Sequence, residues 1–100
     1  MPKLNLAVPH GLSQEEAATR LKGFLEKVRA KYQDKFSDLE EEWTDNTSKF
    51  SFKSMGFAFK GNVAVNDNDV KLEGDLPFAA MMFKGKIEET IRDNLTRLLT

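Results

Sequence analysis

Apolar and polar residues alternate in several stretches of the chain. Leu4, Leu6 and Val8 share one parity, and a period of two residues is typical of a strand with one buried face. The same alternation recurs in four later segments, at residues 39–43, 50–52, 57–65 and 70–76. Runs of turn-forming residues separate these segments. The pattern therefore predicts five strands, each with one apolar and one polar face.

Two other stretches have the period of an amphipathic helix. Ser13 followed by Glu16 forms a capping box, which marks a helix N-terminus. We expect this helix to run from about Gln14 to Gln33, with an apolar face at helical spacing. That face comprises Ala17, Leu21, Phe24, Leu25, Val28 and Tyr32. A second helix is expected from about Met82 to Leu99. Its apolar face comprises Phe83, Ile87, Ile91, Leu95 and Leu98. Six residues of these two faces are expected to be buried against the sheet: Leu21, Phe24, Val28, Ile87, Ile91 and Leu95.

The predicted order of elements is β-α-β-β-β-β-α, which indicates an α+β fold. Consecutive strands joined by short turns pair antiparallel. Two amphipathic helices can cover the apolar face of such a sheet, which gives two layers. The order resembles the TATA-binding-protein-like or helix-grip class, in which a curved sheet wraps a long C-terminal helix. No linker interrupts the pattern, so residues 1–100 are expected to form one domain.

Charge and composition narrow the classes of function. The net charge is −1, whereas a nucleic-acid-binding domain needs a clear basic excess, so we expect no nucleic-acid partner. The absence of cysteine excludes disulfides, thiol catalysis and cysteine-based zinc sites. No stretch approaches the ~20 apolar residues of a transmembrane helix. Residues 1–12 lack the apolar run of a secretory signal, so the expected location is the cytoplasm.

The candidate catalytic and metal-ligating residues have simpler structural explanations. His10 is the only histidine, and it could act as a general base. It stands between a strand end and a helix cap, where a structural role is the stronger expectation. The acidic residues between Asp67 and Asp75 lack the spacing of a calcium loop and are expected to be solvated. We therefore expect no catalytic residue, no metal and no cofactor, and the protein is not expected to be an enzyme.

Two residues are unusual for the faces that they occupy. Glu41 shares the parity of Leu39 and Trp43, so it either guards a sheet edge or lines a cavity. Gly61 lies on an apolar face, where it either marks a bulge or leaves room for a neighbour. The phenylalanines of the central strands are expected to belong to the core. They are Phe50, Phe52, Phe57 and Phe59.

The segment before the second helix holds more apolar side chains than one helix face can bury. Exposed methionines form an adaptable surface that suits a protein partner or a lipid-like surface, and neighbouring lysines can border it. Alternatively, the same side chains close the core. The candidate binding residues are Phe78, Met81, Met82, Phe83, Lys84 and Lys86.

Motifs at both ends of the chain resemble the polyhydroxyalkanoic acid system protein family. At the N-terminal end the similar residues are 9–13 (Pro-His-Gly-Leu-Ser) followed by 15–17 (Glu-Glu-Ala). At the C-terminal end they are 76–78 (Leu-Pro-Phe), 84–88 (Lys-Gly-Lys-Ile-Glu) and a leucine-rich last turn. The resemblance extends over nearly the whole length. It departs at residues 79–82, Ala-Ala-Met-Met, where the family more usually shows leucines.

This resemblance implies a small bacterial cytoplasmic protein associated with polyester storage granules. The family has no established activity, so it supplies no catalytic residues. The expected function is that of a noncatalytic module whose partner is the polyhydroxyalkanoate granule surface or a granule protein; a weak homodimer is left open. The alternative is a carrier of a small apolar ligand, with a pocket between the sheet and the C-terminal helix.

Overall fold

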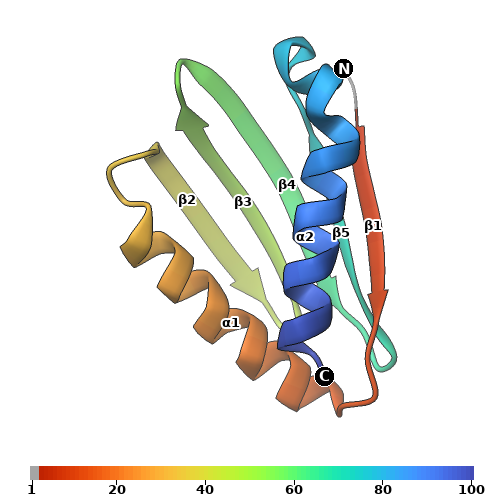
Figure 1. Cartoon of the computed structure of the whole chain (residues 1–100). Coiled ribbons are helices and arrows are strands. Elements are labelled where there is room, and N and C mark those ends of the chain that lie inside the picture. The colour runs from red at the N-terminus through yellow and green to blue at the C-terminus, as the bar shows by residue number, and fades with distance from the viewer. Residues whose placement is uncertain (1–2) are drawn as a thin grey trace.

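The computed structural model describes residues 3–100, which form a five-stranded antiparallel sheet with two α-helices on one face (Figure 1). The elements are β1 (Lys3–Pro9), α1 (Gln14–Lys31), β2 (Ser37–Thr44), β3 (Thr47–Ser54), β4 (Phe57–Val65), β5 (Asp69–Asp75), the 3₁₀ helix η1 (Phe78–Phe83) and α2 (Lys84–Leu98). Their order is the predicted one. Both helices are shorter than expected, because α1 ends at Lys31 and the apolar run before Lys84 forms the separate helix η1.

The strands lie in the order β1-β5-β4-β3-β2. Strands β2 to β5 form a meander, in which each strand pairs with the next through a short turn. The first strand returns to pair with the last, with Lys3 opposite Asp75 and Pro9 opposite Asp69. The two edges of the sheet are therefore β1 and β2.

A side-chain cap fixes the start of α1. Ser13 Oγ accepts a hydrogen bond from the backbone N–H of Glu16 at 3.1 Å, as the sequence predicts. The carboxylate of Glu16 instead accepts a hydrogen bond from Arg20 Nε at 3.0 Å, one turn further along the helix. The capping box is thus half formed, and the helix begins at the expected residue.

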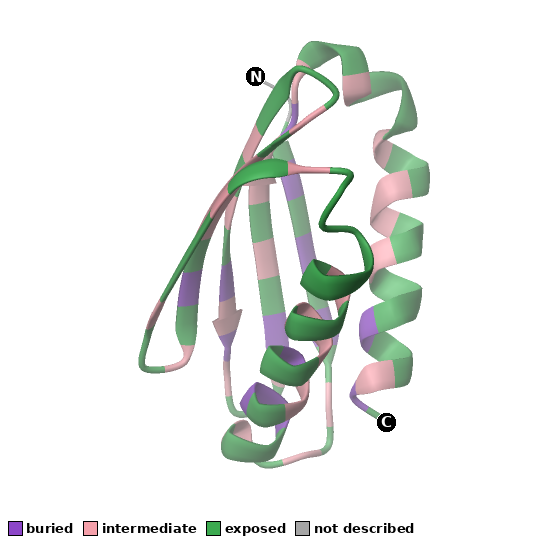
Figure 2. Cartoon of the chain, turned by 90° about the vertical axis from the view of Figure 1, so that its left-hand side faces the viewer, coloured by how far each residue is buried: buried purple, intermediate pink, exposed green. Residues whose placement is uncertain are grey.

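The main buried cluster lies at one end of the two-layer structure, and buried residues continue along β1 towards the other end (Figure 2). Small and aliphatic side chains fill it, and aromatic side chains do not. The buried cluster comprises Val8, Ala17, Ala18, Leu21, Val63, Val65, Val70, Leu95 and Leu99. None of the eight phenylalanines, all of which lie within the described residues, is buried. The expectation of a phenylalanine core is therefore wrong, although the half-buried side chains of Trp43 and Phe50 pack against the cluster.

The helix faces are buried only in part. Leu21 and Leu95 are buried as predicted, whereas Phe24 and Val28 are half-buried. Tyr32, the last residue of the predicted apolar face of α1, is 43% exposed. On α2, the isoleucines that precede Leu95 are also half-buried. The physical reason is the course of the two helices: they approach each other where α1 begins and α2 ends, and α1 diverges from α2 towards its own C-terminal end (Figure 1).

Candidate binding surface

The structure places η1 on the molecular surface. The exposed fractions are 71% for Phe78, 54% for Met81, 88% for Met82 and 60% for Phe83. A 3₁₀ helix advances by three residues per turn, so six consecutive apolar residues surround its axis and cannot all face one core. These four side chains therefore do not close the core. Their binding role remains a prediction.

Two predicted lysines follow η1 directly. Lys84 and Lys86 lie in the first turn of α2, where Lys84 is half-buried and Lys86 is exposed. That turn contains no acidic residue to neutralise them. The apolar surface of η1 is thus bordered by positive charge on its α2 side.

A second exposed apolar site lies in the turn between β3 and β4. Met55 is 91% exposed and Phe57 is 42% exposed. Neither residue stands out in the sequence as a surface candidate, because Phe57 has the parity of a core residue and Met55 lies between two predicted strands. A signal was present: a Met-Gly pair occupies a two-residue hairpin turn, where Asn-Gly or Asp-Gly is the usual choice.

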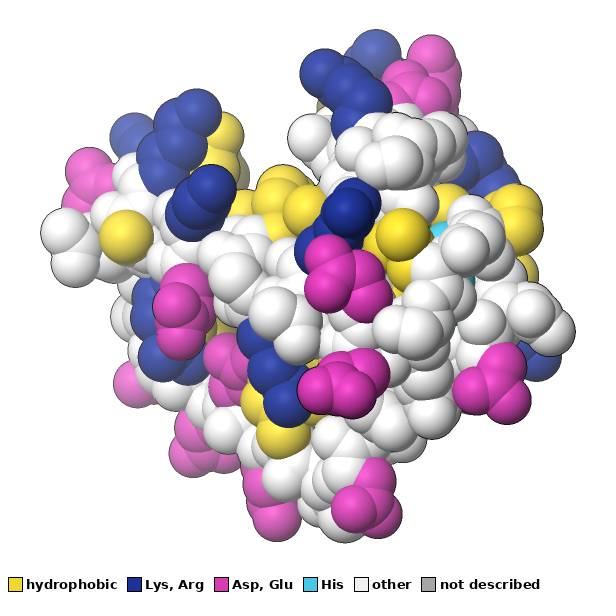
Figure 3. Space-filling view, turned by 90° about the horizontal axis from the view of Figure 1, so that it is seen from below, with side chains coloured by type: hydrophobic (Ala, Val, Ile, Leu, Met, Phe, Trp, Pro, Cys, Tyr) yellow, Lys and Arg dark blue, Asp and Glu magenta, His cyan; other side chains and the backbone are white. Residues whose placement is uncertain are grey.

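A row of aromatic rings covers the helix-facing side of the central strands. The ring centroids of Phe52 lie 5.1 Å from Phe59, 6.5 Å from Phe50 and 5.8 Å from Phe36. Gly61 makes room for this row, because a Cβ atom there would lie 2.9 Å from Phe50 Cζ. The pairing of β4 with both neighbours is regular at Gly61, which excludes the bulge alternative. Figure 3 shows a hollow between the two helices with hydrophobic side chains on its floor.

Glu41 connects the outer end of α1 to the edge strand β2. Its carboxylate accepts hydrogen bonds from Arg29 Nη2 at 3.1 Å and from Trp43 Nε1 at 2.7 Å. The ammonium group of Lys22 lies 4.9 Å from the centroid of the Trp43 ring. Glu41 therefore lies on an edge strand, and its carboxylate links α1 to β2 through Arg29.

His10 has a structural position. Its Nδ1 accepts a hydrogen bond from the N–H of Leu12 at 3.2 Å, which leaves Nε2 to donate to the carbonyl oxygen of Asn66 at 3.0 Å. The ring thus joins the loop before α1 to the turn between β4 and β5. Within residues 3–100, no group of three or more His, Cys, Asp or Glu side chains could hold a metal ion.

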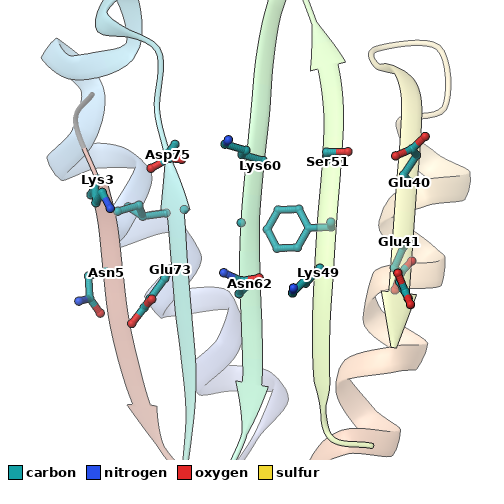
Figure 4. A pocket seen from close by; sticks show the side chains of 15 residues that line it. Lys3, Asn5, Glu40, Glu41, Lys49, Ser51, Lys60, Asn62, Glu73 and Asp75 are labelled. Carbon is teal, nitrogen blue, oxygen red and sulfur yellow. The ribbon is translucent and has the colours of Figure 1, made fainter. Parts of the chain in front are cut away.

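A trough of about 950 Å³ crosses the face of the sheet that carries no helix (Figure 4). Opposite charges are paired across its strands, with Asp75 opposite both Lys3 and Lys60 and with Glu42 opposite Lys49. Such cross-strand pairs are typical of a solvated sheet face. The trough lies on the opposite side of the sheet from α2, so it gives the predicted carrier pocket no support.

Comparison with known proteins identifies the family. The family model described as "Putative polyhydroxyalkanoic acid system protein" matches residues 4–99. No curated protein matches the chain at a significant level. The crystal structure of TTHA0849 from Thermus thermophilus is similar at 11% identity and a TM-score of 0.35, covering 98% of this chain and 92% of that one. A likeness at that level carries no argument. No helix within the described residues is long and apolar enough to cross a membrane. The match over residues 4–99 shows that the chain belongs to the polyhydroxyalkanoic acid system protein family.

Proposed function

We propose that the protein is a noncatalytic module that binds the surface of polyhydroxyalkanoate granules through η1. One observation supports this proposal above the others: four large apolar side chains of η1 are between 54% and 88% exposed. Exposed apolar clusters of this kind mark interaction sites in soluble domains. The polyhydroxyalkanoate granule is chosen as the partner because the family is described as a polyhydroxyalkanoic acid system protein.

The physical basis of the contact is burial of apolar area. Each Å² removed from water contributes about 25 cal/mol before the costs of association are subtracted. Methionine side chains adapt to an irregular polymer surface because they are unbranched and flexible. Lys84 and Lys86 can keep their ammonium groups in water while their stems lie along the apolar boundary. Salt should therefore weaken binding to the polyester only slightly.

The noncatalytic assignment and the cytoplasmic location are parts of the same proposal. Both ring nitrogens of His10 make hydrogen bonds to the backbone, at Leu12 and Asn66, which supports a structural role for this residue. We also propose the helix-grip class for the fold. Its support is the element order, together with two helices on one face of the five-stranded sheet.

The test replaces Met81 and Met82 by serine and measures sedimentation with isolated granules and the unfolding temperature on one sample. We expect the variant to remain in the supernatant and to keep the wild-type unfolding temperature, since both side chains are exposed. The matched control replaces Ala7 and Ala58, exposed on the opposite face of the sheet, by serine. A Met81→Ser/Met82→Ser variant that is folded and still sediments with granules would show that the contact lies elsewhere.

A further inference from the structure

The exposed large apolar side chains of the described residues all lie at one end of the molecule. The turn from β3 to β4 lies at this end, and so does the end of β5, which leads into η1 (Figure 1). The pairing of Lys60 on β4 with Asp75 on β5 places these two strand ends side by side. Ser54 Oγ donates a hydrogen bond to the carbonyl oxygen of Lys35 at 2.8 Å, which places the segment after α1 beside the same turn. The residues are Tyr32, Met55, Phe57, Phe78, Met81, Met82 and Phe83, and we call this end the apolar tip.

Met55 occupies a backbone conformation that its side chain does not favour. Its φ is 55° in a two-residue turn with Gly56, whose φ is 83°. Positive φ at both central positions selects asparagine, aspartate or glycine. In the preceding hairpin the central residue with a positive φ, 54°, is an aspartate, Asp45. The fold therefore does not account for a methionine at position 55, and strain of this kind points to a function.

Charge is distributed unequally between the two ends. The segments that form the apolar tip, 31–38, 53–57 and 78–86, contain five lysines and two aspartates. The loops at the opposite end, 10–16, 45–47 and 66–69, contain five acidic residues, and the neighbouring helix ends add two arginines, Arg20 and Arg97, so acidic charge remains in excess there. An anionic surface therefore attracts the apolar tip and repels the other end, which orients the molecule before contact.

We propose that the protein also docks end-on to an anionic phospholipid layer, with Met55 and Phe57 inserting beside η1. A layer fits these observations better than a peptide does, because three segments that are distant in sequence present apolar side chains at one end. The basic side chains around them match anionic headgroups. This inference shares η1 with the proposed function but does not depend on it, because a phospholipid layer contains no polyester.

The test measures sedimentation with vesicles of phosphatidylcholine, with and without phosphatidylglycerol. We expect binding that requires phosphatidylglycerol and weakens as salt is added. Met55→Asn should weaken it roughly fivefold, because a partly inserted methionine loses about one kcal/mol of apolar burial. The same variant should unfold at the wild-type temperature or above it, because asparagine suits the turn. This combination separates a binding role of Met55 from a structural one.

A charge control completes the design. Lys84→Gln/Lys86→Gln should weaken binding more than tenfold, since each lysine near an anionic layer contributes about 1 kcal/mol. Lys49→Gln/Lys71→Gln removes two exposed lysines from the sheet face without helices and should leave binding at the wild-type level. Equal vesicle binding by wild type and Met55→Asn would overturn the inference. Wild-type protein that sediments with granules but not with anionic vesicles would also overturn it, while leaving the proposed function intact.

Discussion

The divergence of α1 from α2 predicts that two residues of one helix face differ sharply in their contribution to stability. Leu21 is 2% exposed and belongs to the buried cluster, whereas Phe24, one turn further on, is half-buried. Leu21→Ala removes three carbon atoms from a filled core. Their transfer is worth about 2.4 kcal/mol, and the residual cavity raises the total to about 3 kcal/mol.

Phe24→Ala should cost less, although phenylalanine is the larger side chain. Its position borders solvent, so its removal leaves an indentation rather than a closed cavity, and only part of the transfer free energy is lost. We expect about 1.5 kcal/mol, against the 3–5 kcal/mol typical of a buried phenylalanine. For a domain of this size, 1 kcal/mol corresponds to about 5 °C in the unfolding temperature. The expected decreases are thus about 15 °C for Leu21→Ala and about 7 °C for Phe24→Ala.

The assay is thermal unfolding followed by circular dichroism, with urea unfolding as a second measure of the free energy. Comparing the two variants with each other removes most of the uncertainty in the unfolded reference state. A Phe24→Ala variant that is destabilised as much as Leu21→Ala would refute the reasoning. It would mean that the C-terminal half of α1 packs as tightly as its N-terminal half.

Two further variants test local features. Gly61→Ala should destabilise the protein by about 1–3 kcal/mol in urea unfolding, because the new Cβ would lie 2.5 Å from the Glu73 carbonyl oxygen and 2.9 Å from Phe50 Cζ. An unchanged free energy of unfolding would show that the aromatic row can shift away. Glu41→Ala should change global stability by at most about 1 kcal/mol, as exposed ion pairs do. It should increase amide hydrogen exchange in the second half of α1, and unchanged exchange there would contradict the bridging role.

Much of the fold could be predicted from the alternation of apolar and polar residues along the strands. The alternation of Leu4, Leu6 and Val8 is reproduced as three buried positions facing the helices. The cap at Ser13 could be predicted equally well, because the N-cap interaction joins residues that are close in sequence. Parity states which side of a sheet a residue faces. It does not state whether a helix covers that side, and for this reason Phe52 is on the predicted face and yet is not buried.

Only part of the candidate binding surface could be predicted from the sequence. The excess of apolar residues at 78–83 can be counted in the sequence, because no single helix face accommodates them. The contribution of Met55 depends on its being at the same end as η1, which follows from the pairing of β4 with β5. Likewise, the contact of Glu41 with Arg29 depends on the angle between α1 and the sheet. Neither of these two spatial arrangements can be predicted from the spacing of residues along the chain.

The pairing of the first strand with the last has a consequence for biosynthesis. β1 and β5 are separated by residues 10–68, and β1 has no other partner in the sheet. At a ribosomal rate of about 5–20 residues per second, the strand waits roughly 3–12 s for its partner to be made. During that interval Leu4, Leu6 and Val8 are uncovered, because α2, which packs against β1, is made later still, and they are therefore available to chaperones. Closure of the sheet by β1 follows the translation of β5, whereas the hairpins of the meander can form as soon as each leaves the ribosome.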